Sequence, residues 1–432
     1  MEKFSKKIGT IPNDWDFVNA KDCLILESGM RPKEHVTDID TDIPSLGGEN
    51  IDENGFLTFE NVRYISPTYY GKMKKGHIKD EDIYINKDGA NTGKIAFSKK
   101  KPFAECAVNE HVFIIRNNGT FIQQYLFYCL LANFGKQQIL KKIIGSAQEG
   151  INNSFTKGII LPKPSLPEQT AIANILSKVD EAIESVKKSI AVAERLKKSL
   201  MQNLLTGKMK ADGTFRTEEE FYDDPKFGKV PVGWEVKKLG NLFHIKAGGD
   251  LQENFYSPIY DEQHKCPIFS NTIENSGLYG YTSNPRFISK ESLTIVGRGV
   301  GVGHVEYRKG NYDAIIRLIS LIPKQEDAID CMYVNYYICQ YVHFAIESTG
   351  VPQLTCPKVF STKIIIPKNV FEQSQIAEKI HCIDIDIKIK QNQIITLERL
   401  KKSLMQNLLT GKVRVGKNCV CTTKYDQSYN NK

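Results

Sequence analysis

The chain has 432 residues, of which 41% are hydrophobic and 25% are charged, and its formal net charge is +8 at pH 7. This composition is ordinary for a soluble globular protein, and the length predicts two or three folded domains. The mild excess of basic residues is compatible with a nucleic-acid partner but excludes a histone-like polycation. No apolar run approaches the roughly 18 residues of a membrane-spanning helix, and no signal peptide is recognisable, so we expect a cytoplasmic protein without a membrane partner.

The ten cysteines indicate neither a metal site nor a disulfide framework. The only close pair, Cys419 and Cys421, lies near the end of the chain, and the sequence has no Cys-x-x-Cys motif. No Cys/His cluster has the spacing of zinc ligands. The sequence therefore predicts reduced thiols and no metal-binding residues.

The first globular stretch, residues 1–164, is predicted to be an α+β domain. It starts with the motif Pro12-Asn-Asp-Trp15, and short β-rich runs broken by Gly, Asn and Asp follow. The expected elements are strands at 82–85, 111–115 and 159–162 and a helix around 121–143.

A glycine-rich turn follows the strand at 82–85. Gly89 and Gly93 are four residues apart, which allows either a tight hairpin or a close backbone approach to a ligand. The run is not a Walker A loop, because it is one residue short, lacks Ser or Thr after Lys94 and does not open a helix. Basic and amide side chains nearby are candidate DNA contacts, since they can neutralise phosphates or read base edges. These candidates are Lys72, Lys74, Lys75, His77, Asn91, Thr92 and Lys94.

Residues 165–207 are predicted to form one long helix. Ser165 followed three positions later by Glu168 is a capping box, and Gly207 is a typical left-handed helix end. About 40 residues at 1.5 Å each give a length of about 60 Å. Apolar residues recur along the helix in alternating steps of three and four, which predicts a coiled-coil seam.

After a polar linker at 208–229, a second globular stretch at 230–369 repeats the plan of the first. Its start, Pro231-Val-Gly-Trp234, carries the only other tryptophan of the chain. The expected elements are strands at 293–296 and 364–367 and a helix around 331–347, with a second glycine-rich turn at 297–303. The candidate DNA contacts here are Arg298, His304 and Arg308.

A second long helix, at 370–411, repeats the end of the first helix letter for letter, and a patternless tail at 412–432 follows it. The string ERLKKSLMQNLLTGK occurs at 194–208 and again at 398–412, an identity too long for chance. Lys390 alone breaks the apolar seam of the second helix. Because each helix is too amphipathic to stand alone, its simplest partner is the other helix, packed antiparallel as a rigid spacer.

The repeated string has a wider apolar stripe than a two-helix seam needs. This width predicts a surface for docking a partner protein on each of the two copies. Two equal faces imply two copies of one partner. Recombination between DNA repeats could also keep the strings identical, and the stripe could instead pack on the chain's own domains. The candidate docking residues are Lys197, Leu200, Met201, Leu204, Leu205, Lys401, Leu404, Met405, Leu408 and Leu409.

No catalytic residue is predicted. The sequence has no loop of the kind that presents a flipped base to a methyl donor, no metal-dependent nuclease cluster, no helicase P-loop and no nucleophile elbow. We therefore expect a non-catalytic protein that binds DNA. Two alternatives stay open: a nucleotide-binding enzyme that uses the glycine-rich turns, and an interaction scaffold without a DNA role.

These features resemble the specificity (S) subunit of type I restriction–modification systems. The resemblance rests on the duplicated helix end, on the Pro-x-x-Trp start of each globular stretch and on the Glu-Gln-x-x-Ile-Ala start of each long helix at 168–173 and 372–377. It covers nearly the whole chain. It implies an α+β fold with two target recognition domains in a pseudo-twofold arrangement, joined by two long antiparallel helices that form a coiled coil.

The resemblance also implies a function. Each globular domain would read one half of a bipartite site in double-stranded DNA, and the helices would set the spacing and dock two methyltransferase (M) subunits. The complex would methylate adenine N6, and restriction (R) subunits would complete a complex that cleaves DNA. We expect no cofactor in this chain, because S-adenosylmethionine, ATP and Mg would belong to the partner subunits.

Overall fold

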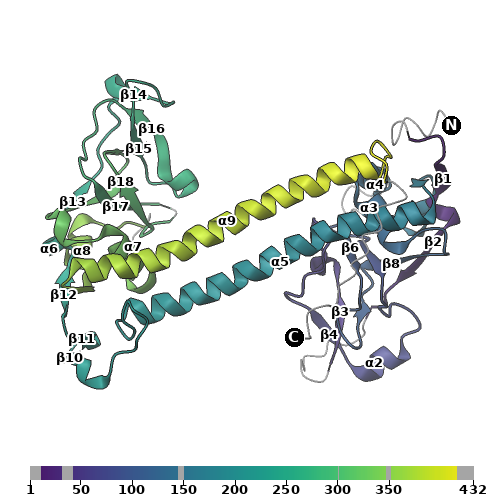
Figure 1. Cartoon of the computed structure of the whole chain (residues 1–432), viewed down its shortest axis with the longest axis horizontal. Helices are drawn as coiled ribbons and strands as arrows, with labels where there is room; N and C mark the ends of the chain where they lie inside the picture. Colours follow the sequence, from purple (N-terminus) through teal and green to yellow (C-terminus); the bar gives the residue numbers. More distant parts are fainter. Residues whose placement is uncertain (1–10, 32–41, 145–149, 300, 347–351, 416–432) are drawn as a thin grey trace, which may run out of the picture. The chain divides into compact units, whose positions relative to one another are not determined.

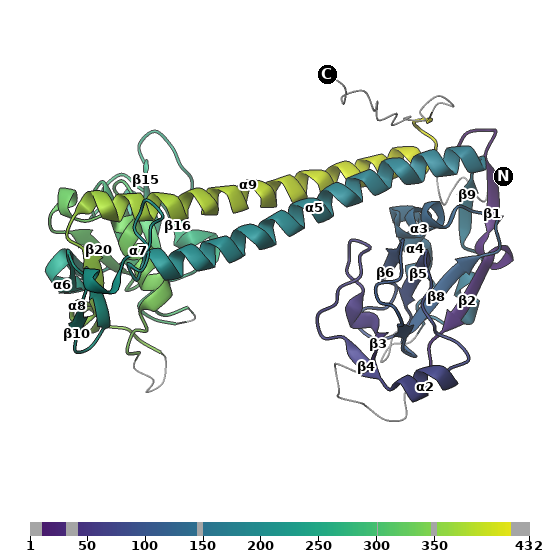
Figure 2. The ribbon, with the colours of Figure 1, turned by 60° about the horizontal axis from the view of Figure 1, so that its bottom comes forward.

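The computed structural model describes residues 11–31, 42–144, 150–299, 301–346 and 352–415 (Figures 1 and 2). The chain divides into two compact units: Met1–Val186 with Gln393–Lys432, and Lys187–Asn392. Each unit therefore holds one globular domain, the beginning of one long helix and the end of the other. Sequence patterns assign each long helix to a segment of its own, whereas the structure divides each helix between the two units.

In the domain of the first unit, the residues that the structure describes form three antiparallel or mixed sheets. The two-stranded sheet pairs β1 (Asp16–Asn19) with β9 (Ile160–Lys163). The four-stranded sheet has the order β2 (Leu24–Ser28), β8 (Val112–Asn117), β5 (Asp82–Asn86) and β6 (Ile95–Ser98). The three-stranded sheet has the order β4 (Arg63–Ile65), β3 (Ile43–Leu46) and β7 (Ala107–Val108).

The four-stranded sheet of the first domain is buried on both faces. Ile83 and Ile85 of β5 point into the main core with Trp15, while Tyr84 between them packs into a second cluster with Ile114. Since successive side chains of a strand face opposite ways, burial on both sides explains the unbroken apolar run in this part of the sequence. The α-helices of the domain among the described residues are α2 (Pro67–Lys72), α3 (Gln123–Leu131) and α4 (Asn133–Leu140).

The single helix predicted around 121–143 is in fact two helices. α3 and α4 are separated at Ala132, whose ψ of 155° is outside the helical range. Figure 2 shows both helices beside β5 and β6, and α3 contacts these two strands. The side chains of α3 from Tyr125 to Leu130 are all buried, so this helix has no exposed polar face in that stretch.

The domain of the second unit has the same plan. β12 (Trp234–Lys238) pairs with β21 (Lys363–Pro367). The first four-stranded sheet has the order β13 (Phe243–Ala247), β20 (Ile319–Pro323), β17 (Glu291–Ile295) and β18 (Val305–Lys309). The second has the order β14 (Tyr256–Ser257), β16 (Leu278–Thr282), β15 (Cys266–Phe269) and β19 (Asp313–Ala314). Its helices are α6 (Leu239–Leu242), α7 (Cys331–Tyr341) and α8 (Cys356–Ser361), and α7 lies on β17 and β18 (Figure 1).

The linker between the first long helix and the second domain contains a hairpin of its own. β10 (Phe221–Asp224) pairs antiparallel with β11 (Gly228–Pro231). The acidic run of the linker precedes this hairpin as a 3-10 turn at Glu218–Glu220.

The two long helices are α5 (Leu166–Leu204) and α9 (Val370–Leu408). A buried glutamine fixes the start of each helix to its domain. Gln169 donates to the Pro164 carbonyl at 2.9 Å and accepts from the Ile122 amide at 2.8 Å. Gln373 makes the same two kinds of bond in the second unit, to Pro367 and Asp330. The shared Glu-Gln motif is therefore a docking element between helix and domain, because buried amides need partners.

The glutamate of the same motif holds the tryptophan that starts each domain. Trp15 Nε1 donates to Glu168 at 3.1 Å, and Trp234 Nε1 donates to Glu372 at 3.1 Å. An arginine completes each cluster: Arg414 binds Glu168 and Asp14, and Arg216 binds Glu372. The end of one long helix is thereby joined to the beginning of the other in both units.

A Tyr–Asp–Lys network ties both helices to the domain of each unit. In the first unit Asp180 of α5 accepts from the Tyr128 hydroxyl at 2.7 Å and pairs with Lys401 of α9 at 2.7 Å. In the second unit Asp384 accepts from Tyr336 at 2.8 Å and pairs with Lys197 at 2.5 Å. With the glutamate clusters, these contacts make the helix segments antiparallel within each unit.

No helix among the described residues is long and apolar enough to cross a membrane. The same part of the chain contains no group of three or more His, Cys, Asp or Glu side chains placed to hold a metal ion.

Candidate nucleic-acid interface

In each domain the loops at one end of a four-stranded sheet lie next to one another. In the first domain a row of paired residues, Ser28–Phe113–Ile85–Ile95, crosses the four strands at this end. In the second domain the corresponding row is Ala247–Ile319–Ile295–Val305. We call the loops beyond these rows the loop edge of each domain. They comprise Gly29, 87–94 and 109–111 in the first domain, and 248–249, 297–303 and 315–317 in the second, with Val300 outside the described residues.

The middle loop of each edge is a short turn, the tip turn, held by matching backbone bonds. In the first domain Asn109 N donates to Leu46 O and Gly29 N to Val112 O. In the second domain Ile315 N donates to Phe269 O and Gly248 N to Leu318 O. The tip turns Asn109–His111 and Ile315–Arg317 therefore occupy the same place in the two domains, although their side chains differ completely.

The glycine-rich turns at the loop edges connect the two strands of a hairpin in each domain. Gly89 and Gly93 have φ values of 80° and 85°, and Gly93 N donates back to Asn86 O at 2.8 Å. In the second domain Gly303 N donates to Val296 O at 2.8 Å. Each turn joins two antiparallel strands and no helix follows, so the geometry lacks the helix N-terminus that cradles a nucleotide phosphate.

The first group of predicted DNA contacts is exposed near the loop edge. Lys72, Lys74 and Lys75 are exposed, and Lys75 Nζ donates to Ser28 Oγ at 3.1 Å, beside the row of paired residues. His77 is half-buried, its Nε2 donates to the Tyr70 carbonyl at 3.2 Å, and its ring packs edge-on against the Tyr70 ring. All three lysines are exposed to a phosphate, although Lys75 also bonds to Ser28, whereas His77 is part of the α2 packing.

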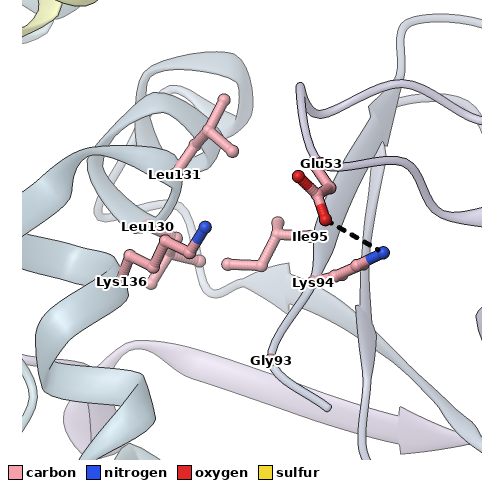
Figure 3. A pocket seen from close by; sticks show the side chains of 7 residues that line it. All are labelled: Glu53, Gly93, Lys94, Ile95, Leu130, Leu131 and Lys136. Atoms are coloured by element: carbon pink, nitrogen blue, oxygen red, sulfur yellow. Dashed lines mark ion pairs between the residues drawn. The ribbon is translucent and has the colours of Figure 1, made fainter. Parts of the chain in front are cut away.

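The second group is largely engaged within the domain. Asn91 Nδ2 donates to Gly48 O at 3.5 Å, and Thr92 Oγ1 donates to Gly89 O at 2.6 Å. Lys94 pairs with Glu53 at 3.6 Å on one side of a small pocket, and Leu131 and Lys136 line the other side (Figure 3). Its volume is about 90 Å³, far below the roughly 300 Å³ of a usual small-molecule site, so a nucleotide does not fit.

In the second domain the predicted residues separate into two exposed side chains and one buried side chain. Arg298 is exposed on the glycine-rich turn, and His304 is exposed directly after it, with Nε2 3.0 Å from Glu306. Arg308 is only 7% exposed, which corrects its prediction as a surface DNA contact. Its guanidinium lies 3.7 Å from the centre of the Phe269 ring, and Nε donates to Thr294 at 2.9 Å. These two contacts join β17 of one sheet to β15 of the other and give Arg308 a structural role, and burial lowers its pKa.

The sequence analysis missed the residues of the tip turns. His111 Nδ1 lies 2.5 Å from Asp88, and the neighbouring Glu110 pairs with Arg31 at 3.6 Å. In the second domain Ile316 and Arg317 are exposed. A short turn between a two-residue strand and a buried strand leaves little periodicity, so only the repeat of the whole domain could have pointed to these positions.

The residues predicted to dock partners are mostly core residues, and this prediction is corrected. Met201, Leu204 and Leu205 are at most 8% exposed in the second core, as are Met405, Leu408 and Leu409 in the first. Leu200 and Leu404 are partly buried against the same cores. Lys197 and Lys401 are engaged by the aspartates described above. The apolar stripe is wide because it packs against the chain's own domains as well as the other long helix.

The comparisons with known proteins give the family of this chain. Residues 12–195 and 231–399 match the type I restriction modification DNA specificity domain family. The two matched segments cover most of the chain and coincide with the two repeats. The chain therefore belongs to this family and has the role of a DNA-specificity subunit.

Individual relatives agree along nearly the whole length. The chain is 29% identical to the type I restriction enzyme MjaX specificity subunit of Methanocaldococcus jannaschii, with 96% of this chain and 97% of the relative covered. It is 26% identical to the MjaVIII specificity subunit of the same organism, with 96% of each chain covered. The crystal structure of the type I restriction–modification S subunit of M. genitalium shares the fold, with a TM-score of 0.58 and 16% identity over 92% of this chain and 97% of that one.

Proposed function

We propose that each globular domain reads one half of a bipartite DNA site through its loop edge, and that the chain itself is non-catalytic. The observation that carries this proposal is the pair of tip turns, which have the same backbone bonds and different side chains. Two domains that recognise different half-sites are expected to have the same backbone structure and different side chains at the positions that contact bases. Exposed lysines beside the first loop edge would hold phosphates and set the register on DNA.

We further propose that α5 and α9 form an antiparallel coiled coil that spaces the two domains. Seam residues Ile172, Leu176 and Ile183 are buried in the first unit, and Ile376 and Ile380 in the second. The two Asp–Lys pairs join the helices within each unit. Lys390, the one break in the predicted seam, turns to Asp386 of its own helix.

The partners we propose are two M subunits, docked on the exposed part of the repeated string, and R subunits in the complete complex. The side chains exposed in both copies form what we call the repeat face. They are Arg195, Leu196, Lys198, Ser199 and Gln202, with Arg399, Leu400, Lys402, Ser403 and Gln406. Leu196 and Leu400 are 51% and 46% exposed. The two copies of the repeated string thus each expose a leucine, with the same residues before and after it. S-adenosylmethionine, ATP and Mg would belong to these partners.

Methylation mapping tests the reading function. The chain is expressed with its M subunit in a host, and N6-methyladenine is located across the genome. We expect a split motif that is absent without this chain. The control is the same M subunit with an unrelated specificity chain of the same family. An active M subunit that gives a motif with that chain but none with ours would contradict the proposal.

The stoichiometry of the purified complex tests the docking face. Leu196→Arg with Leu400→Arg should abolish M-subunit binding, and either single change should leave one M subunit bound, measured by light scattering. Val192→Arg is the matched control, because Val192 is 64% exposed one turn away and has no apolar counterpart in the second copy. Two M subunits on the double variant would rule out the repeat face.

A further inference from the structure

The tip turn of the second domain is strained. Ile316 and Arg317 are consecutive residues with φ values of 53° and 60°, in the left-handed region. A β-branched residue there is rare, because its side chain crowds the backbone, whereas glycine or asparagine adopts the same turn readily. The chain thus keeps an isoleucine and an arginine at two positions where smaller residues would be more stable. Strain of this kind commonly marks a functional site.

The surrounding structure holds the turn in place. Ile316 N donates to Gly249 O at 3.2 Å, and Asn271 Nδ2 donates to the Ile316 carbonyl. Asn271 Oδ1 accepts from Gly297 N at 3.1 Å, so one side chain joins the tip turn to the glycine-rich turn. These bonds fix the backbone of the turn at the centre of the loop edge.

Both side chains of the turn point away from the core. Ile316 is 59% exposed, and Arg317 is exposed with no hydrogen bond or ion pair to the residues that the structure describes. The fork of an arginine matches O6 and N7 of guanine in the major groove, and an apolar side chain contacts the thymine methyl group. An exposed isoleucine beside an unengaged arginine therefore has the chemistry of a base-reading pair.

The tip turn of the first domain has a different chemistry at the same place. Glu110 and His111 stand where the second domain has Ile316 and Arg317, and neither has a positive φ. His111 is engaged by Asp88, and Glu110 by Arg31. A position that keeps its backbone bonds and changes its side chains is expected where two domains read different bases.

We propose that the Ile316–Arg317 turn reads bases directly in the half-site of the second domain, with Arg317 on a guanine and Ile316 on a neighbouring thymine. This inference rests on the proposed function, since it assumes that each loop edge faces DNA. The strained backbone orients both side chains towards solvent, and the hydrogen bonds to Gly249 and Asn271 hold the backbone in this conformation.

The test uses the full chain in complex with its M subunit. Ile316→Asn with Arg317→Gly keeps the turn and removes both side chains. We expect the methylated motif to relax at one or two adjacent positions of one half-site, while the other half-site stays unchanged. The methylation rate at the original site should fall by about 5- to 150-fold, the loss of one bidentate contact. The melting temperature should not fall, because asparagine and glycine relieve the strain.

Arg317→Lys separates fork geometry from charge. The methylated motif should accept other bases at the position of the guanine, because lysine lacks the planar guanidinium group. The salt dependence of DNA binding should stay that of the wild type, because lysine keeps the positive charge. Lys309→Ala is the control, since Lys309 is exposed at the opposite end of β18. It removes one positive charge and should leave the motif intact.

The outcomes separate this inference from the function on which it rests. If the wild-type chain directs a split motif and both turn variants keep that motif unchanged, the inference fails and the proposed function stands. If the wild-type chain directs no split motif beside an active M subunit, the proposed function fails and the inference fails with it.

Discussion

Lys401 and Lys197 hold the same position in two identical 15-residue strings, yet their surroundings differ. The Lys401 side chain is 9% exposed and its partner Asp180 is 14% exposed. Lys197 and Asp384 are 29% and 32% exposed. Lys401 also donates to the Asn54 carbonyl at 3.1 Å. Replacing each lysine with methionine therefore compares a buried ion pair with a half-exposed one in the same local sequence.

Removing one partner of a buried ion pair destabilises a protein by about 3–5 kcal/mol, because the other charge stays buried without compensation. A partly exposed pair contributes about 1 kcal/mol or less, since water screens it and can solvate the remaining charge. We expect Lys401→Met to lower the unfolding free energy of the first unit by about 3 kcal/mol. Lys197→Met should lower that of the second unit by about 1 kcal/mol.

The two tryptophans allow each unit to be followed separately. Trp15 lies in the first core and Trp234 in the second. Urea unfolding is measured by fluorescence, with Lys401→Met in a Trp234→Phe background and Lys197→Met in a Trp15→Phe background. Each variant is compared with its own single-tryptophan parent. If the two lysine substitutions lowered the unfolding free energies of their units by the same amount, the burial of the Lys401–Asp180 pair would not determine its contribution.

The pH dependence gives a second check on the same variant. Burial raises the pKa of Asp180 above its ordinary value, and Lys401 and Tyr128 oppose this rise. Without Lys401 the pKa should be higher still. A carboxyl with a raised pKa in the folded state contributes stability that is complete below its unfolded pKa, about 4, and is lost as the pH rises through the folded pKa. The deficit of Lys401→Met should therefore shrink from pH 7 towards pH 5, and a constant deficit would contradict the mechanism.

Two further predictions concern a helix end and the buried thiols. Gly411→Ala should destabilise the first unit by about 1–3 kcal/mol in the same urea assay, because φ is 68° and the new Cβ would lie 2.4 Å from a proline ring. Gly228→Ala is its control, with the same φ of 68° and open space around the Cβ, so an equal loss would exclude the clash. Burial raises the pKa of Cys23 to about 11 and of Cys129 to about 12, so both should react with a thiol reagent at pH 8 only as fast as the chain unfolds. Exposed Cys382 should react at once, and immediate reaction of Cys129 would show that its core opens.

The long helices could be predicted from sequence because local signals agree along their whole length. A capping box, a steady apolar spacing and a terminal glycine mark both, and α5 and α9 begin and end within a few residues of the expected bounds. The short strands of the domains were only partly visible, since burial on both faces removes alternation. The break between α3 and α4 falls at Ala132, and Gly135 in the first turn of α4 leaves room for the Cys129 carbonyl of α3. A single glycine inside a helical pattern was not enough to predict this break.

The functional residues were harder to predict than the fold, for a physical reason. Arg308 and the leucines of the repeated string look like surface candidates, because the sequence does not show which face the domain covers. Conversely, Ile316 looks like an ordinary apolar residue, and only its φ and its exposure distinguish it. Backbone strain and tertiary burial are not encoded in a local pattern, whereas charge and periodicity are.

The division of the long helices has a consequence for the order in which the chain folds during synthesis. The core of the second unit is built from residues between Met201 and Ile380, while the core of the first unit includes Leu408 and Leu409. The ribosome therefore supplies every part of the second core before it supplies the last part of the first. The first domain therefore keeps part of its apolar core exposed until the end of α9 has been synthesised, and exposed surface of this kind makes a nascent chain prone to aggregation.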